Sequence, residues 1–341
     1  METIYIDGSR GEGGGQILRT SLTLACITGK SLRMENIRAA RRKPGLARQH
    51  LSCVHAACQI CDGHCQGDAL GSQVLDFQPG PIRSSDFTFD IGSAGSVSLV
   101  IQTVLPALFL AGKPSTVTVT GGTHNPWAPP FDFLHETFLP AIADAGFRTD
   151  CRLIKHGFLP AGGGKITFEI QPWQADAGRM INLCEPSNNA QINARIYTAR
   201  LPEHVAQKQR ALLLQSNLNI KHIEHIEVTD SDGPGNCLMI RLCNGGTAVF
   251  TTFGMRRKPS RDVVNEAVTL ADDFLSSDAA VDRYLADQLL IYMALSKAGC
   301  YTTNELSTHL TTNIETINKF LPVSFKTEQQ DRIYRISCIP A

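Results

Sequence analysis

Apolar and polar positions near the start of the chain predict a strand followed by a helix and a second strand. Thr3 to Ile6 has the short pattern of a strand, and apolar side chains recur at helical spacing from about Gln16 to Thr28. Five glycines separate these two segments, and Gly29 is expected to end the helix. A further strand is expected around Leu32 to Ile37, which completes one βα-type unit.

The same unit recurs further along the chain. Gly8-Ser9-Arg10-Gly11 matches Gly92-Ser93-Ala94-Gly95, and the Gly29-Lys30 pair that ends the first helix matches Gly112-Lys113. A third and weaker copy is expected at Tyr284 to Gly299. The spacing is too long for a solenoid repeat, so it indicates a few copies of an α+β module, each with its helices buried against one sheet face.

Between the second and third copies the pattern changes. A polar break at residues 185–189 comes before a new group of predicted elements. These are strands near 192–197, 223–228, 238–242 and 247–253, and helices near 203–214 and 261–274. We therefore predict an α+β fold in which repeated βα-type modules, residues 1–182 and 278–341, form a large domain, and a smaller α+β domain, residues 183–277, is inserted before the last module.

The amino-acid composition excludes several classes of protein. Lys and Arg number 32 and Asp and Glu number 32, so the formal charge is zero, and binding of nucleic acid by bulk positive charge is excluded. The 11 cysteines are an odd number, which a fully paired disulfide scaffold does not have. The N-terminus lacks the pattern of a signal peptide, and the longest apolar stretch, 97–111, is broken by polar residues and Pro106. We expect a cytoplasmic protein with no membrane partner; the sequence gives no oligomeric state.

The first candidate site is the glycine-rich segment Gly11 to Gln16. Glycines allow backbone amides to approach an anion closely, and a helix N-terminus favours negative charge. Glu12 within such a loop is a candidate ligand of a divalent metal beside phosphates. The alternative is a tight turn with an exposed glutamate. The segment does not match the dinucleotide-binding fingerprint, and neither Gly29-Lys30-Ser31 nor 162–165 completes a P-loop.

The second candidate site is the basic segment 38–50, which holds five Lys and Arg residues and no acid. Arginine presents a planar fork that suits phosphate oxygens, and Pro44-Gly45 indicates a loop. The segment therefore favours anion or nucleic-acid binding over a merely solvated charge run. A second cluster, Arg256-Arg257-Lys258 with Arg261, is a weaker candidate.

Other motifs allow two interpretations each. The segment Cys58 to Cys65 has a C-x-x-C spacing, but no distant partner pair completes a zinc site, and its cysteines fall among apolar helix positions. The proline-rich loop 121–130 is either a wall for a flat ring, with Trp127 available to stack on a base, or a crossover loop with fixed turns.

Two C-terminal segments add polar candidates. Tyr284, Asp287 and Gln288 share one face of a predicted helix, which is either a site or a solvated surface. Asn313 is expected to cap the next helix, which places His309 in the strand or turn before it. His309 there is a candidate nucleophile or general base, or a hydrogen-bonded histidine among threonines.

Taken in order along nearly the whole chain, these segments resemble the RNA 3′-terminal phosphate cyclase family, most closely its bacterial enzymes. The segments that carry the resemblance are Gly11 to Arg19, Ile37-Arg38-Ala39, Lys43 to Leu46 with Gln49-His50, Ala94-Gly95-Ser96 with Gln102, Gly121-Gly122-Thr123 with Ala128-Pro129, Pro160 to Gly164, Tyr284 to Gln288, and the His309 segment. The family fold consists of repeated α+β modules with a smaller domain inserted before the last one.

The resemblance implies ATP-dependent cyclisation of an RNA 3′-phosphate in three steps. His309 attacks the α-phosphorus of ATP and carries AMP, the RNA 3′-phosphate then takes the AMP, and the neighbouring 2′-OH displaces it to leave a 2′,3′-cyclic phosphate. Glu12 is implied to bind Mg²⁺ or Mn²⁺. The residues implied to form the adenosine pocket are Gln102, Pro129, Tyr284, Leu285, Ala286, Asp287 and Gln288. The residues implied to bind phosphates of ATP or of the RNA end are Arg38, Arg41, Gln49 and His50, with Arg19 assisting.

Two other functions are compatible with related folds. A non-catalytic RNA-binding relative of the cyclases would lack the nucleophilic histidine, whereas this chain has His309. An enolpyruvyl transferase would use no adenylylated histidine. Labelling by ATP distinguishes both alternatives from the cyclase.

Overall fold

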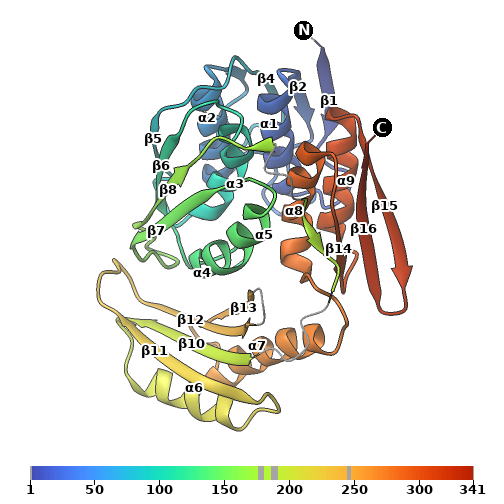
Figure 1. The fold of residues 1–341 in the computed structure, drawn as a ribbon. Coiled ribbons are helices and arrows are strands. Elements are labelled where there is room, and N and C mark those ends of the chain that lie inside the picture. Colours follow the sequence, from blue (N-terminus) through green and yellow to red (C-terminus); the bar gives the residue numbers. More distant parts are fainter. Residues whose placement is uncertain (1, 176–179, 186–190, 244–246, 341) are drawn as a thin grey trace.

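The computed structural model describes residues 2–175, 180–185, 191–243 and 247–340. Within these residues it contains four sheets of four strands each, all mixed, together with helices (Figure 1). Three of the sheets belong to modules that share one strand order, and the fourth belongs to a segment set between parts of the third module. The chain therefore has the mixed α/β fold that its pattern predicts.

The first module follows the order β-α-β-α-β-β. Its elements are β1 (Thr3–Asp7), α1 (Gln16–Thr28), β2 (Ser31–Glu35), α2 (Arg48–Cys61), β3 (His64–Gln66) and β4 (Leu75–Gln78). The strands lie in the order β1-β2-β4-β3; β1 and β2 are parallel, and the other pairs are antiparallel. Parallel neighbours need a crossover, which α1 supplies. Asn36 (φ 54°) and Arg38 (φ 55°) turn the chain after Glu35, so β2 ends before the predicted Ile37.

The second module repeats this order with a broken second helix. Its elements are β5 (Asp86–Asp90), α3 (Val97–Leu108), β6 (Ser115–Gly121), the consecutive helical segments α4 (Phe131–Phe133), η1 (Leu134–Phe138) and α5 (Leu139–Ala143), β7 (Thr149–Lys155) and β8 (Gly164–Ile170). The strand order β5-β6-β8-β7 again joins one parallel pair to two antiparallel pairs. Both copies of the sequence repeat thus form the same arrangement.

The third module is divided. Its elements are β9 (Asn182–Leu183), α8 (Arg283–Ser296), β14 (Cys300–Thr303), α9 (Thr308–Phe320), β15 (Val323–Gln330) and β16 (Ile333–Pro340). The strand order β9-β14-β16-β15, with β9 and β14 parallel, repeats that of the other two modules. The weak third copy in the sequence is therefore a full module whose first strand is separated from the remaining elements.

The intervening elements, which we call the insert, form their own sheet and core. They are β10 (Gln191–Ala199), α6 (His204–Leu214), β11 (Ile220–Val228), β12 (Gly235–Cys243), β13 (Thr247–Phe253) and α7 (Ser260–Leu275). The strands lie in the order β11-β10-β12-β13, and α6 and α7 contact this sheet. Figure 1 shows the insert below the three modules, with its sheet toward them. The predicted domain limits at 182/183 and 277/278 stay a prediction.

The helices of the three modules pack against one another, and their sheets lie outside them (Figure 1). α1 contacts α2, α3 and α9, and α8 contacts α9. Tyr292 of α8 joins the second and third modules, because its buried ring lies 5.0 Å from that of Phe147 and 5.6 Å from that of Phe138. The insert has a separate apolar cluster under α6 and α7.

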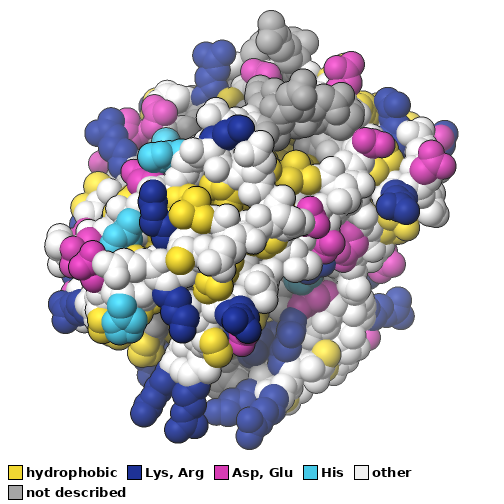
Figure 2. All heavy atoms as spheres, turned by 90° about the horizontal axis from the view of Figure 1, so that it is seen from below, with side chains coloured by type: hydrophobic (Ala, Val, Ile, Leu, Met, Phe, Trp, Pro, Cys, Tyr) yellow, Lys and Arg dark blue, Asp and Glu magenta, His cyan; other side chains and the backbone are white. Residues whose placement is uncertain are grey.

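Seen from the side of the insert, the surface carries both signs of charge, and Lys and Arg side chains gather along one edge of the view (Figure 2). The chain has no net charge, so this gathering of Lys and Arg is a local excess of positive charge. Among the described helices, none combines the length and the apolar character needed to cross a bilayer.

Tyr292→Ala should lower the free energy of unfolding by about 3–5 kcal/mol, because it leaves a cavity among three packed aromatic rings, those of Phe109, Phe138 and Phe147. Tyr5→Ala is the matched control, since Tyr5 is 70% exposed, and it should change stability by less than about 0.5 kcal/mol. Urea unfolding followed by circular dichroism measures both. Equal losses in the two variants would contradict the role of Tyr292 in joining the modules.

Candidate active site

The glycine-rich loop between β1 and α1 brings charged side chains close to the start of α1. A Cβ on Gly14 would lie 2.2 Å from Oε1 of Glu12, and one on Gly15 would lie 2.2 Å from Nε2 of His50 and 2.9 Å from Nη1 of Arg19. Any larger residue at these positions would displace those side chains. The glycines therefore serve close packing of a polar cluster, which favours a site over a simple turn.

His309 lies in the first turn of α9, which corrects its predicted place in a strand or turn before the helix. The helix begins at Thr308 because the hydroxyl of Ser307 accepts a hydrogen bond from the amide of Leu310 at 3.1 Å, so Ser307 is the cap. The predicted cap, Asn313, is inside the helix. Its side chain instead accepts from Thr20 Oγ1 and donates to the backbone carbonyl of Asp287.

Gln16, the first residue of α1, links His309 to Asp287. The Nε2 atom of Gln16 donates to Oδ2 of Asp287, and its Oε1 atom lies 2.5 Å from Nδ1 of His309. When Asp287 is ionised it can only accept, which fixes the orientation of the Gln16 amide and makes Nδ1 of His309 the protonated nitrogen. Nε2 of His309 keeps its lone pair, and this atom lies 4.0 Å from Oε1 of Glu12.

Basic groups lie near His309 and His50 and keep both imidazoles neutral. Burial, together with Arg19, Arg41 and Arg283, lowers the pKa of His309 below its usual value. Burial and the charges of Arg19, Arg38 and Arg41 lower the pKa of His50 to about 3. His309 is therefore neutral near pH 7, the state in which an imidazole is nucleophilic.

Asp287 has an environment that opposes its charge. Burial raises its pKa to about 7, and the neighbouring carboxylate of Asp282 adds to the effect, while Arg19 and the hydrogen bond from Gln16 act against it. Asp282 is the cap of α8 and accepts from the amides of Tyr284 and Leu285, yet burial raises its pKa to about 6. The contacts of Gln16 with His309 and Asp287 thus include a carboxyl group whose pKa lies close to neutrality.

The surroundings of the Glu12 carboxylate suit the binding of a cation. Its side chain is 8% exposed, Arg41 pairs with Oε1, and the buried Oε2 has no hydrogen-bond partner. An orphaned carboxylate oxygen beside basic groups fits a divalent metal whose other ligands are phosphate and water oxygens. The described residues contain no cluster of three or more His, Cys, Asp or Glu side chains that could hold a metal alone.

Two further residues predicted for a phosphate site, Arg38 and Gln49, are held by contacts outside the first glycine loop. Arg38 donates to the carbonyl of Gly45 at 2.7 Å, which shapes the basic loop 38–47. Oε1 of Gln49 accepts from the amide of Ser96 at 2.9 Å, which joins α2 to the start of α3. The structure therefore brings the basic segment of the first module against the second glycine loop.

The residues predicted for an adenosine pocket come from α3 and α8. Gln102 of α3 donates to Oε1 of Gln288 of α8, and Tyr284, one turn earlier, is 39% exposed with the Arg283 guanidinium 5.0 Å from its ring centroid. The side chains of Leu285 and Ala286 are buried, so they pack behind this face. The structure thus gives an accessible polar edge to α8.

Pro129 lies in the loop between β6 and α4. The chain at the start of this loop pairs with the start of α3 through the bridge between Ser96 and Gly122, and the Asn125 side chain donates to the carbonyl of Ala94. Trp127 in the same loop is 85% exposed. The loop is therefore fixed at its base, and its Trp127 side chain is exposed to solvent.

The cysteine segment is a packing feature. Cys53 and Cys61 are buried in α2, and all described cysteines are free thiols, with no described metal cluster among them. In contrast, Gln16 contacts both His309 and Asp287, although its sequence pattern assigned it no role. The one signal available was its position as the first helical residue after the glycine loop.

Comparisons with known proteins show which sequences this chain is similar to. A sequence model of the family described as RNA 3′-terminal phosphate cyclase matches residues 10–327. The RNA 3′-terminal phosphate cyclase of Pseudomonas fluorescens Pf-5 is 42% identical over 341 residues, covering 99% of this chain and 98% of that protein. The protein of the same description from Ralstonia nicotianae is 45% identical over 330 residues (96% and 94%), and that from Koribacter versatilis is 43% identical over 343 residues (99% and 95%).

Asp287→Asn should remove part of the pH dependence of stability. The folded chain holds the Asp287 proton more tightly than the unfolded chain, because its pKa is raised from 3.8 to about 7. This contribution to stability is therefore present below about pH 4 and is lost as the pH rises to about 7. One pKa unit corresponds to about 1.4 kcal/mol, so the loss is at most about 4 kcal/mol.

Urea unfolding between pH 4 and pH 8 measures this effect. The difference in free energy of unfolding between Asp287→Asn and the unchanged protein should grow as the pH rises. Asp273→Asn, at an exposed position of α7, should show a constant difference across the same range. Parallel pH profiles for the unchanged protein and Asp287→Asn would contradict the buried environment of Asp287.

Proposed function

The chain belongs to the RNA 3′-terminal phosphate cyclase family, and from this premise we propose that it is an enzyme that converts an RNA 3′-terminal phosphate to a 2′,3′-cyclic phosphate at the expense of ATP. The observation that carries the proposal is the position of His309. Its Nδ1 is held by Gln16, and its Nε2 faces a carboxylate with an orphaned oxygen beside several arginines.

In the first step the lone pair on Nε2 of His309 attacks the α-phosphorus of ATP. A P–N bond forms, the bond from the α-phosphorus to the bridging oxygen breaks, and pyrophosphate leaves. The Nδ1 proton stays on the ring, where Gln16 accepts its hydrogen bond. An adenylylated imidazolium forms, and it transfers AMP readily because the ring is a good leaving group.

In the second step an oxygen of the RNA 3′-phosphate attacks the AMP phosphorus, the P–N bond breaks, and an RNA–pp–A end forms. In the third step the 2′-oxygen attacks the activated terminal phosphorus and loses its proton. AMP leaves, and the cyclic phosphate remains. A phosphate monoester oxygen is a poor leaving group, so prior attachment of AMP makes ring closure feasible, and proximity makes it intramolecular.

Arg19, Arg38, Arg41, Gln49 and His50 are proposed to bind the phosphates of ATP and of the RNA end. Arg19, Arg41 and His50 lie against the glycine loop at the N-terminus of α1, and Gln49 lies against the second glycine loop. Because burial and the nearby arginines keep His50 neutral, it can donate a hydrogen bond without adding charge. The arginines supply the positive charge that offsets the triphosphate.

Gln102, Tyr284, Asp287 and Gln288 are proposed to bind adenosine, with Pro129 as the opposite wall. The accessible edge of α8 supports this assignment, and the buried Leu285 and Ala286 hold the edge in place. Glu12 is proposed to hold Mg²⁺ or Mn²⁺ through its orphaned oxygen. When bound, the metal supplies charge neutralisation for the ATP phosphates.

His309→Ala should abolish covalent labelling by ATP. The protein is incubated with α-³²P-ATP and Mg²⁺ or Mn²⁺ without RNA, then separated on a denaturing gel. The unchanged protein should carry an acid-labile, alkali-stable label that EDTA prevents and that an RNA 3′-phosphate removes. His222→Ala, at an exposed position of β11, is the control and should label fully. An unchanged protein that takes no label with either metal would sink the proposal in favour of an RNA-binding or enolpyruvyl-transfer function.

Gln16→Leu should slow formation of the labelled protein roughly 100-fold without preventing ATP binding, because the Nδ1 proton loses its acceptor and the imidazole can adopt the wrong tautomer. Gln16→Glu keeps an acceptor for Nδ1 and should retain more activity, although it loses the donor to Asp287. Single-turnover rates at saturating ATP measure the effect. Equal rates for Gln16→Leu and the unchanged protein would show that the tautomer is set elsewhere.

A further inference from the structure

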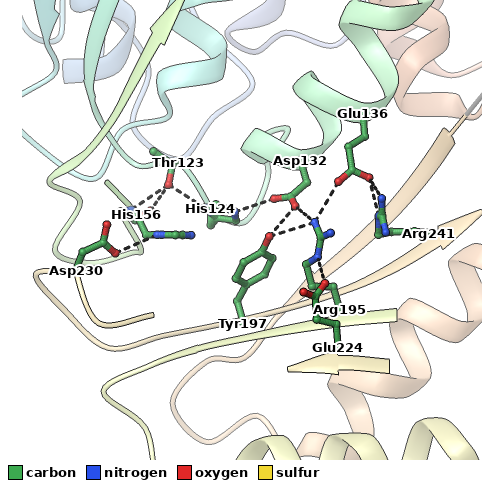
Figure 3. A network of polar contacts seen from close by, with 11 residues as sticks. Thr123, His124, Asp132, Glu136, His156, Arg195, Tyr197, Glu224, Asp230 and Arg241 are labelled. Carbon is green, nitrogen blue, oxygen red and sulfur yellow. Dashed lines mark hydrogen bonds and ion pairs between the residues drawn. The ribbon is translucent and has the colours of Figure 1, made fainter. Parts of the chain in front are cut away.

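The insert contains none of the residues predicted for the site, yet it is bound to the second module through charged side chains. Figure 3 shows Arg195 and Tyr197 of β10 pointing from the insert toward Asp132 of α4. Arg195 Nη1 donates to Oδ1 of Asp132 at 2.6 Å, and the hydroxyl of Tyr197 donates to the same oxygen at 2.7 Å. The Asp132 side chain is 3% exposed, so these contacts lie in the interior of the protein.

A second carboxylate extends this contact along the same helical segment. Arg195 Nη1 also donates to Oε1 of Glu136 in η1 at 3.1 Å, and Arg241 Nε of β12 donates to Oε2 of Glu136 at 2.6 Å. Glu224 of β11 accepts from Nε of Arg195 at 2.9 Å, which fixes the guanidinium from the insert side. Arg195 therefore joins both carboxylates, whereas Arg241 joins only Glu136.

The other oxygen of Asp132 closes the base of the loop 125–131. It lies 3.0 Å from Nε2 of His124, and the amide of Phe131 donates to the carbonyl of Thr123 at 3.0 Å. His124 is in turn 2.8 Å from Oγ1 of Thr123. One carboxylate thus binds the two ends of the loop together and also receives both donors from the insert.

The line Thr123–His124–Asp132 has the partners of a nucleophile triad, but its setting excludes that function. The His124 side chain is 0% exposed and Thr123 is 3% exposed, so no substrate reaches the hydroxyl. The hydroxyl of Thr123 also accepts from the amide of Gly157 at 2.9 Å. The line is a structural connection between the loop and its surroundings.

The loop needs such a connection because its conformation is unfavourable on its own. Trp127 has a φ of 63°, a region that large side chains rarely adopt and that persists only where the surroundings impose it. The Trp127 ring is 85% exposed, so packing of that ring does not supply the constraint. The constraint comes from the ends of the loop, where Asp132 lies.

We propose that Arg195 and Tyr197 of the insert are positioning residues that fix the loop 125–131 through Asp132, and so set the affinity for the adenine nucleotide. The proposal rests on the proposed function, in which Pro129 of this loop is one wall of the adenosine pocket. The insert then acts on nucleotide binding without touching the nucleotide.

The test uses Trp127 as a reporter of the loop. The chain has two tryptophans, so in a Trp173→Phe background Trp127 is the sole tryptophan and is excited selectively over the tyrosines. Time-resolved anisotropy of Trp127 measures the motion of the loop, and initial rates of AMP transfer give KM for ATP and kcat separately. Each variant is also checked for its melting temperature and circular dichroism.

Arg195→Met should increase the fast depolarisation of Trp127 and raise KM for ATP about fivefold or more, with kcat changed by less than twofold. Tyr197→Phe should give a smaller change of the same kind. Arg195→Lys keeps the positive charge and should change the anisotropy and KM less than Arg195→Met does. Arg241→Met is the matched control, since it removes an ion pair of the same interface that does not involve Asp132. It should leave both readouts unchanged.

Two results would overturn the proposal. One is a folded Arg195→Met protein with unchanged Trp127 anisotropy and unchanged KM. The other is an equal effect of Arg195→Met and Arg241→Met, which would indicate a general loss of the interface. If the unchanged protein takes no AMP label, the proposed function fails instead, and the anisotropy of Trp127 alone then decides whether Arg195 positions the loop.

Discussion

The mutual burial of helices from three modules is the constraint on which the site depends. In each module the helices cover one face of their own sheet, and their outer sides pack against helices of the neighbouring modules. This packing places the start of α1, the start of α8 and the first turn of α9 in one region. The contact between Gln16, Asp287 and His309 exists because those three helix starts are held together by the apolar residues beneath them.

The same packing explains the electrostatics of the site. Helix starts in a shared core place Asp287 and Arg19 where water has little access, so burial is the largest influence on their pKa values. Burial and nearby arginines depress the pKa of His309, and burial and Asp282 raise that of Asp287. Neutral imidazole and guanidinium groups therefore lie close together, which is the combination that the proposed attack on ATP needs.

Local patterns predicted much of this fold, because its helices have clear apolar faces and clear ends. The helix from Gln16 to Thr28 is confirmed at both bounds, and Gly29 at φ 69° ends it as glycine in that position does. His309 was placed wrongly because Ser307 and Asn313 are both good caps, and only the contacts of Asn313 with Thr20 and Asp287 decide between them. For Gln16 the only local signal is its position at the start of a helix after the glycine loop, and Arg195 has none, because the partners of both residues lie far away in the sequence.

The division of the third module has a consequence for the order in which the chain is made. β9 is synthesised before the insert, but its parallel partner β14 follows the insert; Cys300 and Asn182, which pair across them, are 118 positions apart. The cost of closing a long segment grows slowly with its length, so the folded insert is an acceptable interruption. The sheet of this module nevertheless stays incomplete until nearly the whole chain has left the ribosome. His309 follows β14, and we therefore expect that a nascent chain holds the proposed phosphate-binding residues of the first module for some time before it holds the proposed nucleophile.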